Sequence, residues 1–217
     1  MVRVSMVSVV PITHGGRTLI RMFPHFFGGF GRRIASLIAA SAIAATTVVA
    51  TAPTASADDL DRTSNQVVAQ IEAEPWPHYE RGDRSVDIQA ARKLLAYHGY
   101  RSDSTTSWFF NLSLQQTILR YQAANPNHLA ETGELDDETW LLLRERTFGE
   151  FGPNSRGLVV EMIQSELNAK FDAGLTVDGR YGTRTTNAVR AAQRDFGIGV
   201  DGIVGRLTFR ALITYQP

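Results

Sequence analysis

The sequence of 217 residues predicts an all-α fold built from two tandem three-helix bundles, and two observations lead to this prediction. First, the pattern Asp-Gly-x-[Tyr/Val]-Gly-x-x-Thr occurs at 178–185 and again at 201–208, each time before apolar residues at helical spacing. Second, residues 80–146 repeat the same order of apolar positions in a degenerate form. The Asp-Gly pair suits a tight turn, because Asp can bond its own backbone and Gly accepts positive φ. We expect the second glycines, Gly182 and Gly205, to bend the chain sharply, which positive φ there would allow.

The C-terminal part of the chain has three predicted helices. Apolar residues at a spacing of three and four mark one helix from Val160 to Phe171, a second from Thr185 to Phe196 and a third from Thr208 to Tyr215. Gly197 directly follows the second helix and is its predicted C-cap. Helices this short, joined by tight turns, form a compact three-helix unit.

Residues 80–150 form the degenerate copy of this unit. The positions that correspond are Ile88, Ala91, Arg92 and Leu95 with Val160, Ile163, Gln164 and Leu167, and Tyr121-Gln122 with Ala192-Gln193. The first Asp-Gly turn is replaced by Ser107-Trp108, so ligand binding is less secure in this copy. The acidic run Asp136-Asp137-Glu138 opens the third helix. We interpret it as an N-cap that complements the helix dipole, in preference to a catalytic pair of carboxylates.

Residues 157–212 resemble the peptidoglycan-binding-domain family, a three-helix module found in many secreted cell-wall hydrolases. The residues that match its pattern are Val160-x-x-Ile163-Gln164-x-x-Leu167, Val177-Asp178-Gly179-x-Tyr181-Gly182-x-x-Thr185 and Val200-Asp201-Gly202-x-Val204-Gly205-x-x-Thr208. Ala192 and Phe209 stand where the family commonly has Phe and Trp. The resemblance implies two tandem bundles of this type, the first degenerate, with bacterial peptidoglycan as the partner.

The chain divides into four predicted segments. Residues 1–57 are expected to be a signal peptide, since an uncharged apolar run is followed by the small residues Ala55-Ser56-Ala57. Residues 58–79 are expected to be a linker, either a flexible tether or a loose helix. The modules occupy 80–150 and 151–217, and the short connection between them implies that they touch or hold a restricted angle. The apolar run is too short for a stable membrane span, so we expect a secreted, extracellular or wall-associated protein.

Composition excludes several classes of function. The 22 basic residues equal the 22 acidic ones, but residues 1–57 hold five arginines and no acid. Removing those five leaves 17 basic against 22 acidic residues, a net charge of −5 that argues against nucleic acid as a partner. Cysteine is absent, which excludes disulfides and thiolate chemistry. The histidines beyond the signal, His78, His98 and His128, lie too far apart for a helical metal motif, so we expect no metal and no cofactor.

The candidate binding residues are Arg180, Tyr181, Gly182, Thr183 and Arg184. They lie at the start of the second helix of the C-terminal module, where free N–H groups and the helix dipole favour anions. An arginine can bind a carboxylate in a bidentate fork, and a tyrosine offers a flat face to a sugar. The alternative for Tyr181 is a buried packing position, and we weigh the two equally. Trp76, between two prolines, could likewise be a stacking platform, but we favour packing on the following helices.

These observations predict a monomeric, non-catalytic protein that binds peptidoglycan. Two hypotheses from other classes remain. The chain could be a small wall hydrolase with an unrecognised site, or an adaptor whose first module binds another protein. Release of soluble fragments from purified wall would indicate the hydrolase, and capture of a partner by residues 80–150 would indicate the adaptor.

Overall fold

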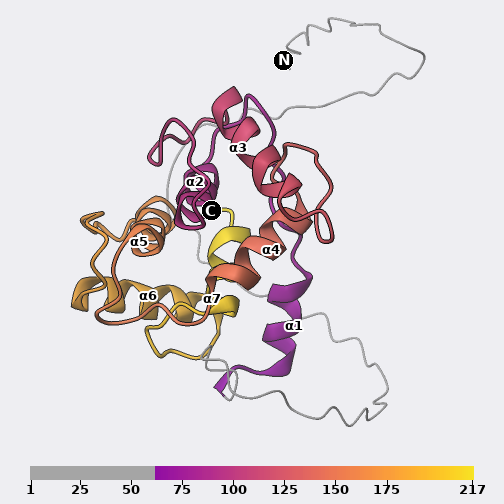
Figure 1. Cartoon of the computed structure of the whole chain (residues 1–217). Coiled ribbons are helices and arrows are strands. Elements are labelled where there is room, and N and C mark those ends of the chain that lie inside the picture. Colours follow the sequence, from indigo (N-terminus) through magenta and orange to yellow (C-terminus); the bar gives the residue numbers. More distant parts are fainter. Residues whose placement is uncertain (1–61) are drawn as a thin grey trace, which may run out of the picture. The chain divides into compact units, whose positions relative to one another are not determined.

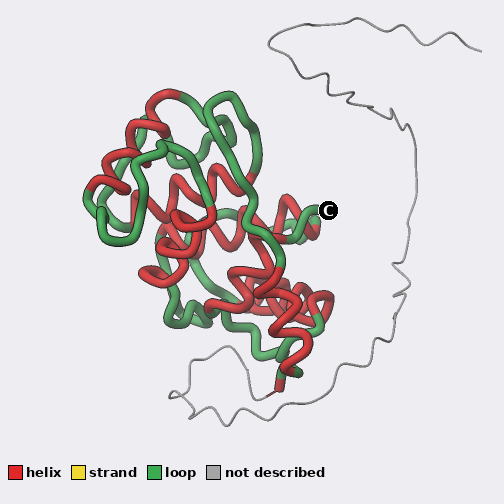
Figure 2. The backbone as a smooth tube through the Cα atoms, turned by 90° about the vertical axis from the view of Figure 1, so that its right-hand side faces the viewer, coloured by secondary structure: helices red, strands yellow, loops and turns green. Residues whose placement is uncertain are grey.

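A computed structural model of the chain describes residues 62–217, which contain seven helices and no strand longer than a single bridging pair (Figures 1 and 2). The helices are α1 (Asn65–Ala73), α2 (Val86–Tyr97), α3 (Leu112–Ala123), α4 (Asp137–Thr147), α5 (Leu158–Phe171), α6 (Thr183–Phe196) and α7 (Arg206–Thr214). The described part of the chain is therefore all-α, as predicted. The expected signal peptide, 1–57, lies outside the described residues.

Two modules of three helices, α2 to α4 and α5 to α7, repeat one backbone plan. In each module two single bridging pairs connect the segment before the first helix to the two turns that follow. The pairs are Arg84 with Phe109 and Tyr79 with Leu135 in the first module, and Arg156 with Arg180 and Phe151 with Val204 in the second. The same antiparallel pairing at equivalent positions supports the internal repeat read from the sequence. Tyr79 and Phe151 thus occupy equivalent places.

A buried amide side chain fastens each Asp-Gly turn of the second module. Gln193 Nε2 donates to Asp201 Oδ1 at 2.7 Å and to the Ile203 carbonyl at 2.9 Å, while its Oε1 accepts from Gly202 N at 2.8 Å. Gln164 makes the equivalent bonds to Asp178 Oδ1 and to the N–H of Gly179. Each glutamine provides hydrogen-bond partners for N–H and oxygen groups of the turn. Leaving such groups without partners in the interior would destabilise the fold.

The first module keeps this arrangement where its sequence has diverged. Gln122 Oε1 accepts from Gly133 N at 2.8 Å, so the second turn is held as in the other copy. In the rebuilt first turn, the buried Arg92 guanidinium takes the glutamine's place. It donates to the Phe109 carbonyl and to Asn111 Oδ1, both at 2.8 Å. A guanidinium reaches further and has five donors, which allows it to hold the longer and more polar loop.

Within the two Asp-Gly motifs, the glycines with positive φ are the ones directly after the aspartates. Gly179 has φ of +66° and Gly202 has φ of +80°. Gly182 and Gly205, where we considered positive φ, instead have φ of −96° and −103°, in extended backbone. They are the N-caps of α6 and α7, and an N-cap residue adopts extended geometry just before the helix begins. The chain therefore reverses at the Asp-Gly pair, not at the second glycine.

The two modules share one hydrophobic core and an interface between α2 and α5. Lys93, late in α2, pairs with Glu161, early in α5, at 2.9 Å. Asp87, early in α2, pairs with Lys170, late in α5, at 2.6 Å. These two pairs show that the helices run antiparallel. The short connection between the modules does bring them into contact, as the sequence predicted.

The described part of the expected linker is folded against both modules and is not a flexible tether. Helix α1 packs on α7, and its Glu72 carboxylate pairs with Arg144 of α4 at 2.7 Å. Trp76 is only 7% exposed and stacks on Trp140 of the first module, with ring centroids 6.0 Å apart. The guanidinium of Arg210, from the second module, lies 4.2 Å from the Trp76 ring centroid. Trp76 thus packs on the helices that follow, as we favoured.

Candidate functional site

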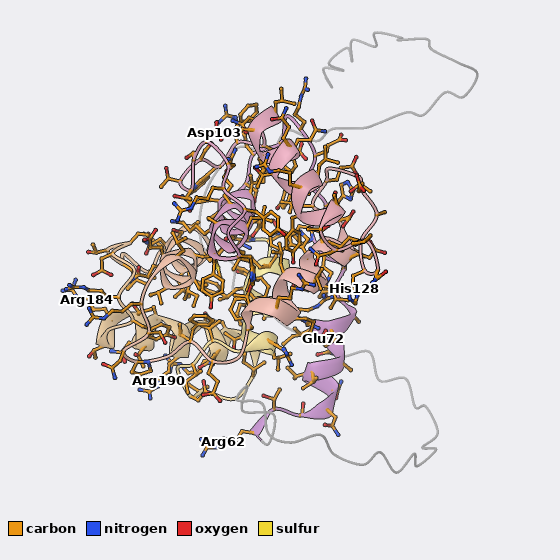
Figure 3. The ribbon with its side chains drawn as sticks, in the orientation of Figure 1. Arg62, Glu72, Asp103, His128, Arg184 and Arg190 are labelled. Carbon is orange, nitrogen blue, oxygen red and sulfur yellow. The ribbon has the colours of Figure 1, made fainter. Side chains whose placement is uncertain are left out.

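Four of the five predicted binding residues line one shallow groove. Arg180, Gly182, Thr183 and Arg184 are exposed and border a space of about 350 Å³ beside the first turn of α6. Thr183 and Arg184 are the first two residues of the helix, and Arg184 points outward from it (Figure 3). The groove therefore combines two guanidinium groups with the positive end of a helix dipole, an arrangement that favours carboxylates and other anions.

Tyr181 is buried, which is one of the two positions that the sequence allowed for it. It is 3% exposed, and its hydroxyl donates to the Gly202 carbonyl at 2.9 Å. Burial raises the pKa of Tyr181, with a further contribution from the charge of Asp201. The ring connects the two Asp-Gly turns of the second module from within. We therefore assign the ring a structural role; Tyr181 also borders the second groove described below.

The two modules differ in how their helices begin. In the first module the side chains of Ser85, Asn111 and Asp136 each accept a hydrogen bond from a backbone N–H of the following helix. The Asp136 bond, to Thr139 N at 2.9 Å, confirms the capping interpretation of the acidic run. In the second module glycine is the N-cap of α5, α6 and α7, and no side chain caps them. Only the second module leaves the N–H groups of its first helical turns without a side-chain cap.

A second groove, of about 280 Å³, lies on the other side of the α6 start. Gly182 and Thr183 border both grooves. The rest of the lining consists of Pro153, Tyr181 and Thr186, together with the exposed residues Asn154, Asn187 and Arg190. Arg190 is exposed, points outward, and bonds the Asp201 carbonyl only at 3.3 Å (Figure 3). Sequence reasoning missed these three exposed residues. Arg190 follows Thr183 by seven residues, so the helical repeat places both on one face and could have indicated it.

One acidic group lies in the first groove. Asp178 is exposed, and its Oδ1 accepts hydrogen bonds from Gln164 Nε2 at 3.0 Å and Arg180 N at 2.9 Å. The bond from Gln164, followed by that from the Arg180 backbone, lowers the pKa of Asp178. The Asp178 carboxylate therefore stabilises the turn through these two hydrogen bonds. Arg180 and Arg184 then give this groove a net positive charge.

A cluster of buried charges lies between the modules, away from both grooves. Lys170 Nζ is 2.6 Å from Asp87 Oδ1 and 3.2 Å from Glu166 Oε2, and it also donates to the carbonyls of Leu212 and Ile213. Both carboxylates are 0% exposed. Loss of hydration raises the pKa of Glu166 to about 8, opposed by Lys170 and assisted by the charge of Asp87. The acids lie close together, but they are sealed from substrate.

The described residues offer neither a metal centre nor a membrane span. Within residues 62–217, no three His, Cys, Asp or Glu side chains converge in a way that could hold a metal ion. His98 instead bonds Thr147 at 2.8 Å, and burial lowers its pKa. None of the helices in this part of the chain is long and apolar enough to cross a bilayer.

Comparison with known families places the start of α6, which borders both grooves, inside a recognised module. Residues 156–212 match the family described as "Putative peptidoglycan binding domain". The C-terminal module belongs to this family. The match covers α5, α6 and most of α7, with both Asp-Gly turns. It nearly coincides with the segment whose motifs resembled the family. The presence of this domain indicates an association with the cell wall.

A curated relative extends the similarity beyond this domain. The chain is 30% identical, over 149 residues, to N-acetylmuramoyl-L-alanine amidase CwlM of Mycobacterium tuberculosis. The alignment covers 60% of this chain and 36% of that protein. The chain thus spans about a third of the length of the amidase.

Proposed function

We propose that this protein is a secreted, non-catalytic peptidoglycan-binding protein whose C-terminal domain makes the main contact with the wall. The observation that carries the proposal is the coincidence of the matched family with the cationic grooves. Both grooves lie within or beside residues 156–212, at an N-terminus of a helix that no side chain caps. Stem peptides of the wall carry carboxylates, which suit guanidinium and N–H donors.

The rigid connection between the modules supports a role as one binding unit. Residues 62–217 share a continuous core, and the helices α2 and α5 are locked by two ion pairs. The first module therefore holds the peptidoglycan-binding domain in a fixed orientation. Two sites of one chain that engage the same polymer gain retention by effective concentration, without requiring a tight single site.

Sedimentation with insoluble peptidoglycan tests the proposal. Replacing Arg180 and Arg184 together by Ala is expected to weaken wall binding by about tenfold, or about 1.4 kcal/mol, because charge-assisted contacts are lost. The matched control is Arg146→Ala with Arg194→Ala, which removes the same charge from exposed positions outside both grooves. Binding that is equally weakened by both variants would show a general charge effect and contradict the site.

The same experiment separates the non-catalytic proposal from a hydrolase. The supernatant of the wild-type incubation is analysed for soluble wall fragments. We expect none above the level given by heat-denatured protein. Fragments released in proportion to protein and time would instead favour an enzyme, the class named for the relative.

A further inference from the structure

We propose that a third groove, formed where the N-terminal segment meets the end of α7, binds the neutral, N-acetylated glycan strand of the wall. The groove has a volume of about 700 Å³ and is larger than either groove at α6. That volume is within the range of pockets that enclose small ligands, and it leaves room for a disaccharide. The inference rests on the proposed function, because it names which part of peptidoglycan this chain contacts there.

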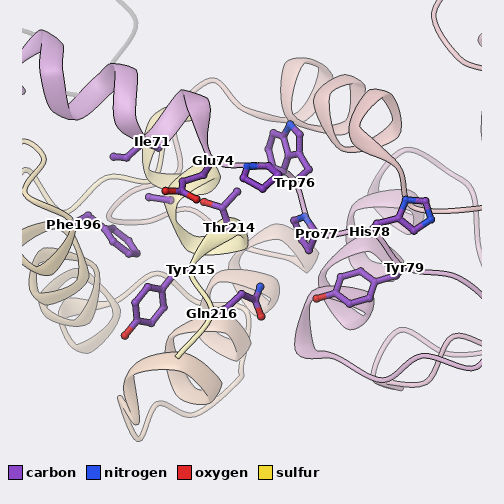
Figure 4. A pocket seen from close by; sticks show the side chains of 12 residues that line it. Ile71, Glu74, Trp76, Pro77, His78, Tyr79, Phe196, Thr214, Tyr215 and Gln216 are labelled. Atoms are coloured by element: carbon purple, nitrogen blue, oxygen red, sulfur yellow. The ribbon is translucent and has the colours of Figure 1, made fainter. Parts of the chain in front are cut away.

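The groove is built partly from residues outside the matched family. One wall consists of residues 71–79, which precede both modules, and Figure 4 shows Pro77 and Tyr79 on this side. The opposite wall carries Phe196 and Tyr215, and Gln216 lies between the two sides (Figure 4). The groove therefore exists only because the segment before the modules is folded against α7. A peptidoglycan-binding domain alone would lack it.

The wall that carries Tyr215 has a rigid aromatic surface. The Tyr215 ring stacks on Phe171 with centroids 5.0 Å apart and an interplanar angle of 18°, and Phe196 meets it at 67° with centroids 5.9 Å apart. Tyr215 thus keeps a fixed orientation without a ligand. A sugar ring presents C–H groups on its faces, and these pack on supported aromatic and proline surfaces while the hydroxyls stay directed at polar neighbours.

The polar groups of the groove suit hydroxyl and amide partners. The Glu74 side chain is exposed, and its carboxylate accepts no hydrogen bond from any group in residues 62–217. The Gln216 amide makes only long contacts, 3.5 Å to Asp87 Oδ2 and 3.4 Å to the Ile213 carbonyl. A carboxylate accepts strongly from sugar hydroxyls, and a primary amide can both donate to and accept from an acetamido group.

Charge distinguishes this groove from those at α6. Among the described residues that line it, Glu74 is the one acid, and none is lysine or arginine. Arg210, which does not line the groove, binds the Glu74 carbonyl and interacts with the charge of Glu74. A groove with no cationic lining residue offers no charged partner to stem-peptide carboxylates or anionic polymers, whereas it accepts a neutral glycan. The two sets of grooves would then bind chemically different parts of the same polymer.

The test is a fluorescence titration of the full-length protein with a soluble N-acetylglucosamine oligosaccharide, which carries no stem peptide. We expect saturable binding that Tyr215→Ala weakens at least fivefold. Glu74→Gln should weaken it as well, and this exposed position does not endanger folding. Arg180→Ala with Arg184→Ala is the matched control and should leave oligosaccharide binding unchanged. Raising the salt concentration should leave it unchanged too, because the contact involves a neutral ligand.

The outcomes separate this inference from the proposed function. No oligosaccharide binding by a protein that still sediments with insoluble peptidoglycan would overturn the glycan groove alone. Binding that survives both Tyr215→Ala and Glu74→Gln would place the sugar elsewhere and also overturn it. Failure to bind either the oligosaccharide or the wall would contradict both proposals.

Discussion

Replacing Glu166 by Gln is expected to stabilise the protein at pH 8 while leaving its stability at pH 4.5 nearly unchanged. Glu166 is fully buried beside Asp87, and the single ammonium of Lys170 lies 2.6 Å from Asp87 but 3.2 Å from Glu166. Neither Glu166 oxygen accepts a hydrogen bond of ordinary geometry from the described residues. One cation can neutralise only one of two carboxylates, so the native state favours a protonated Glu166.

The magnitude follows from the pKa. Loss of hydration raises the pKa of Glu166 from its usual 4.5 to about 8 in the folded state. Folded protein therefore holds a proton that unfolded protein releases, and stability falls as the pH rises between these two values. The slope is about 1.4 kcal/mol per pH unit, which amounts to at most about 5 kcal/mol at pH 8. The glutamine variant is neutral at every pH and avoids this loss.

The assay is urea unfolding, followed by circular dichroism, at several pH values from 4.5 to 8. The difference in unfolding free energy between variant and wild type should grow with pH, because all other groups are common to both proteins. The control is Glu161→Gln, whose side chain is 31% exposed and pairs with Lys93. That variant should be less stable than wild type, because the buried Lys93 ammonium loses its partner. A difference for Glu166→Gln that is flat or declines with pH would show a charged native Glu166 and refute the reasoning.

Three further predictions concern the turns, the folded linker and the wall contact. Gly202→Ala should lower the free energy of unfolding in urea by about 1–3 kcal/mol, because φ is +80° and a Cβ would lie 2.9 Å from Thr186 Cγ2. The control Gly182→Ala should be nearly neutral, because a Cβ there meets nothing within 4 Å. Trp76→Ala should lower the free energy of unfolding by about 3–5 kcal/mol in the same assay, because it removes a buried indole stacked on Trp140. A loss of stability no larger than that caused by a substitution at an exposed position would contradict the packing role of Trp76. Wild-type sedimentation with peptidoglycan should weaken as salt is raised, and unchanged binding would argue against the arginine contacts.

The repeat itself could be predicted because it depends on short-range patterns. Apolar spacing fixed the expected positions of α2 to α7, and the Asp-Gly pairs located both turns of the second module. Gly197 ends α6 in left-handed geometry, with φ of +70°, as its place after the helix indicated. Each of these features depends on residues within the turn or helix itself, so a single sequence is enough to predict them.

The sequence favoured packing of Trp76 on the following helices, but it could not predict where helix α1 docks, because the causes lie far along the chain. Helix α1 has no buried residue of its own and looks like a solvated segment. Its position depends on Glu72 meeting Arg144 and on Trp76 meeting Trp140 and Arg210. Partners more than sixty residues away leave no local signal. The same limitation applies to Tyr181, because its burial depends on the Gly202 carbonyl.

The divergence of the first module is best understood from what it now supports. Its helix starts are capped by side chains, so it does not offer the uncapped N–H groups found in the second. It instead holds the segment before it: Trp140 Nε1 donates to the Pro77 carbonyl at 2.9 Å, and Tyr79 pairs with Leu135. Those two contacts fix the wall of the third groove that faces Tyr215. The first module therefore has capped helix starts and holds Pro77 through Trp140. We infer that its role is to position a binding surface that it shares with the second module.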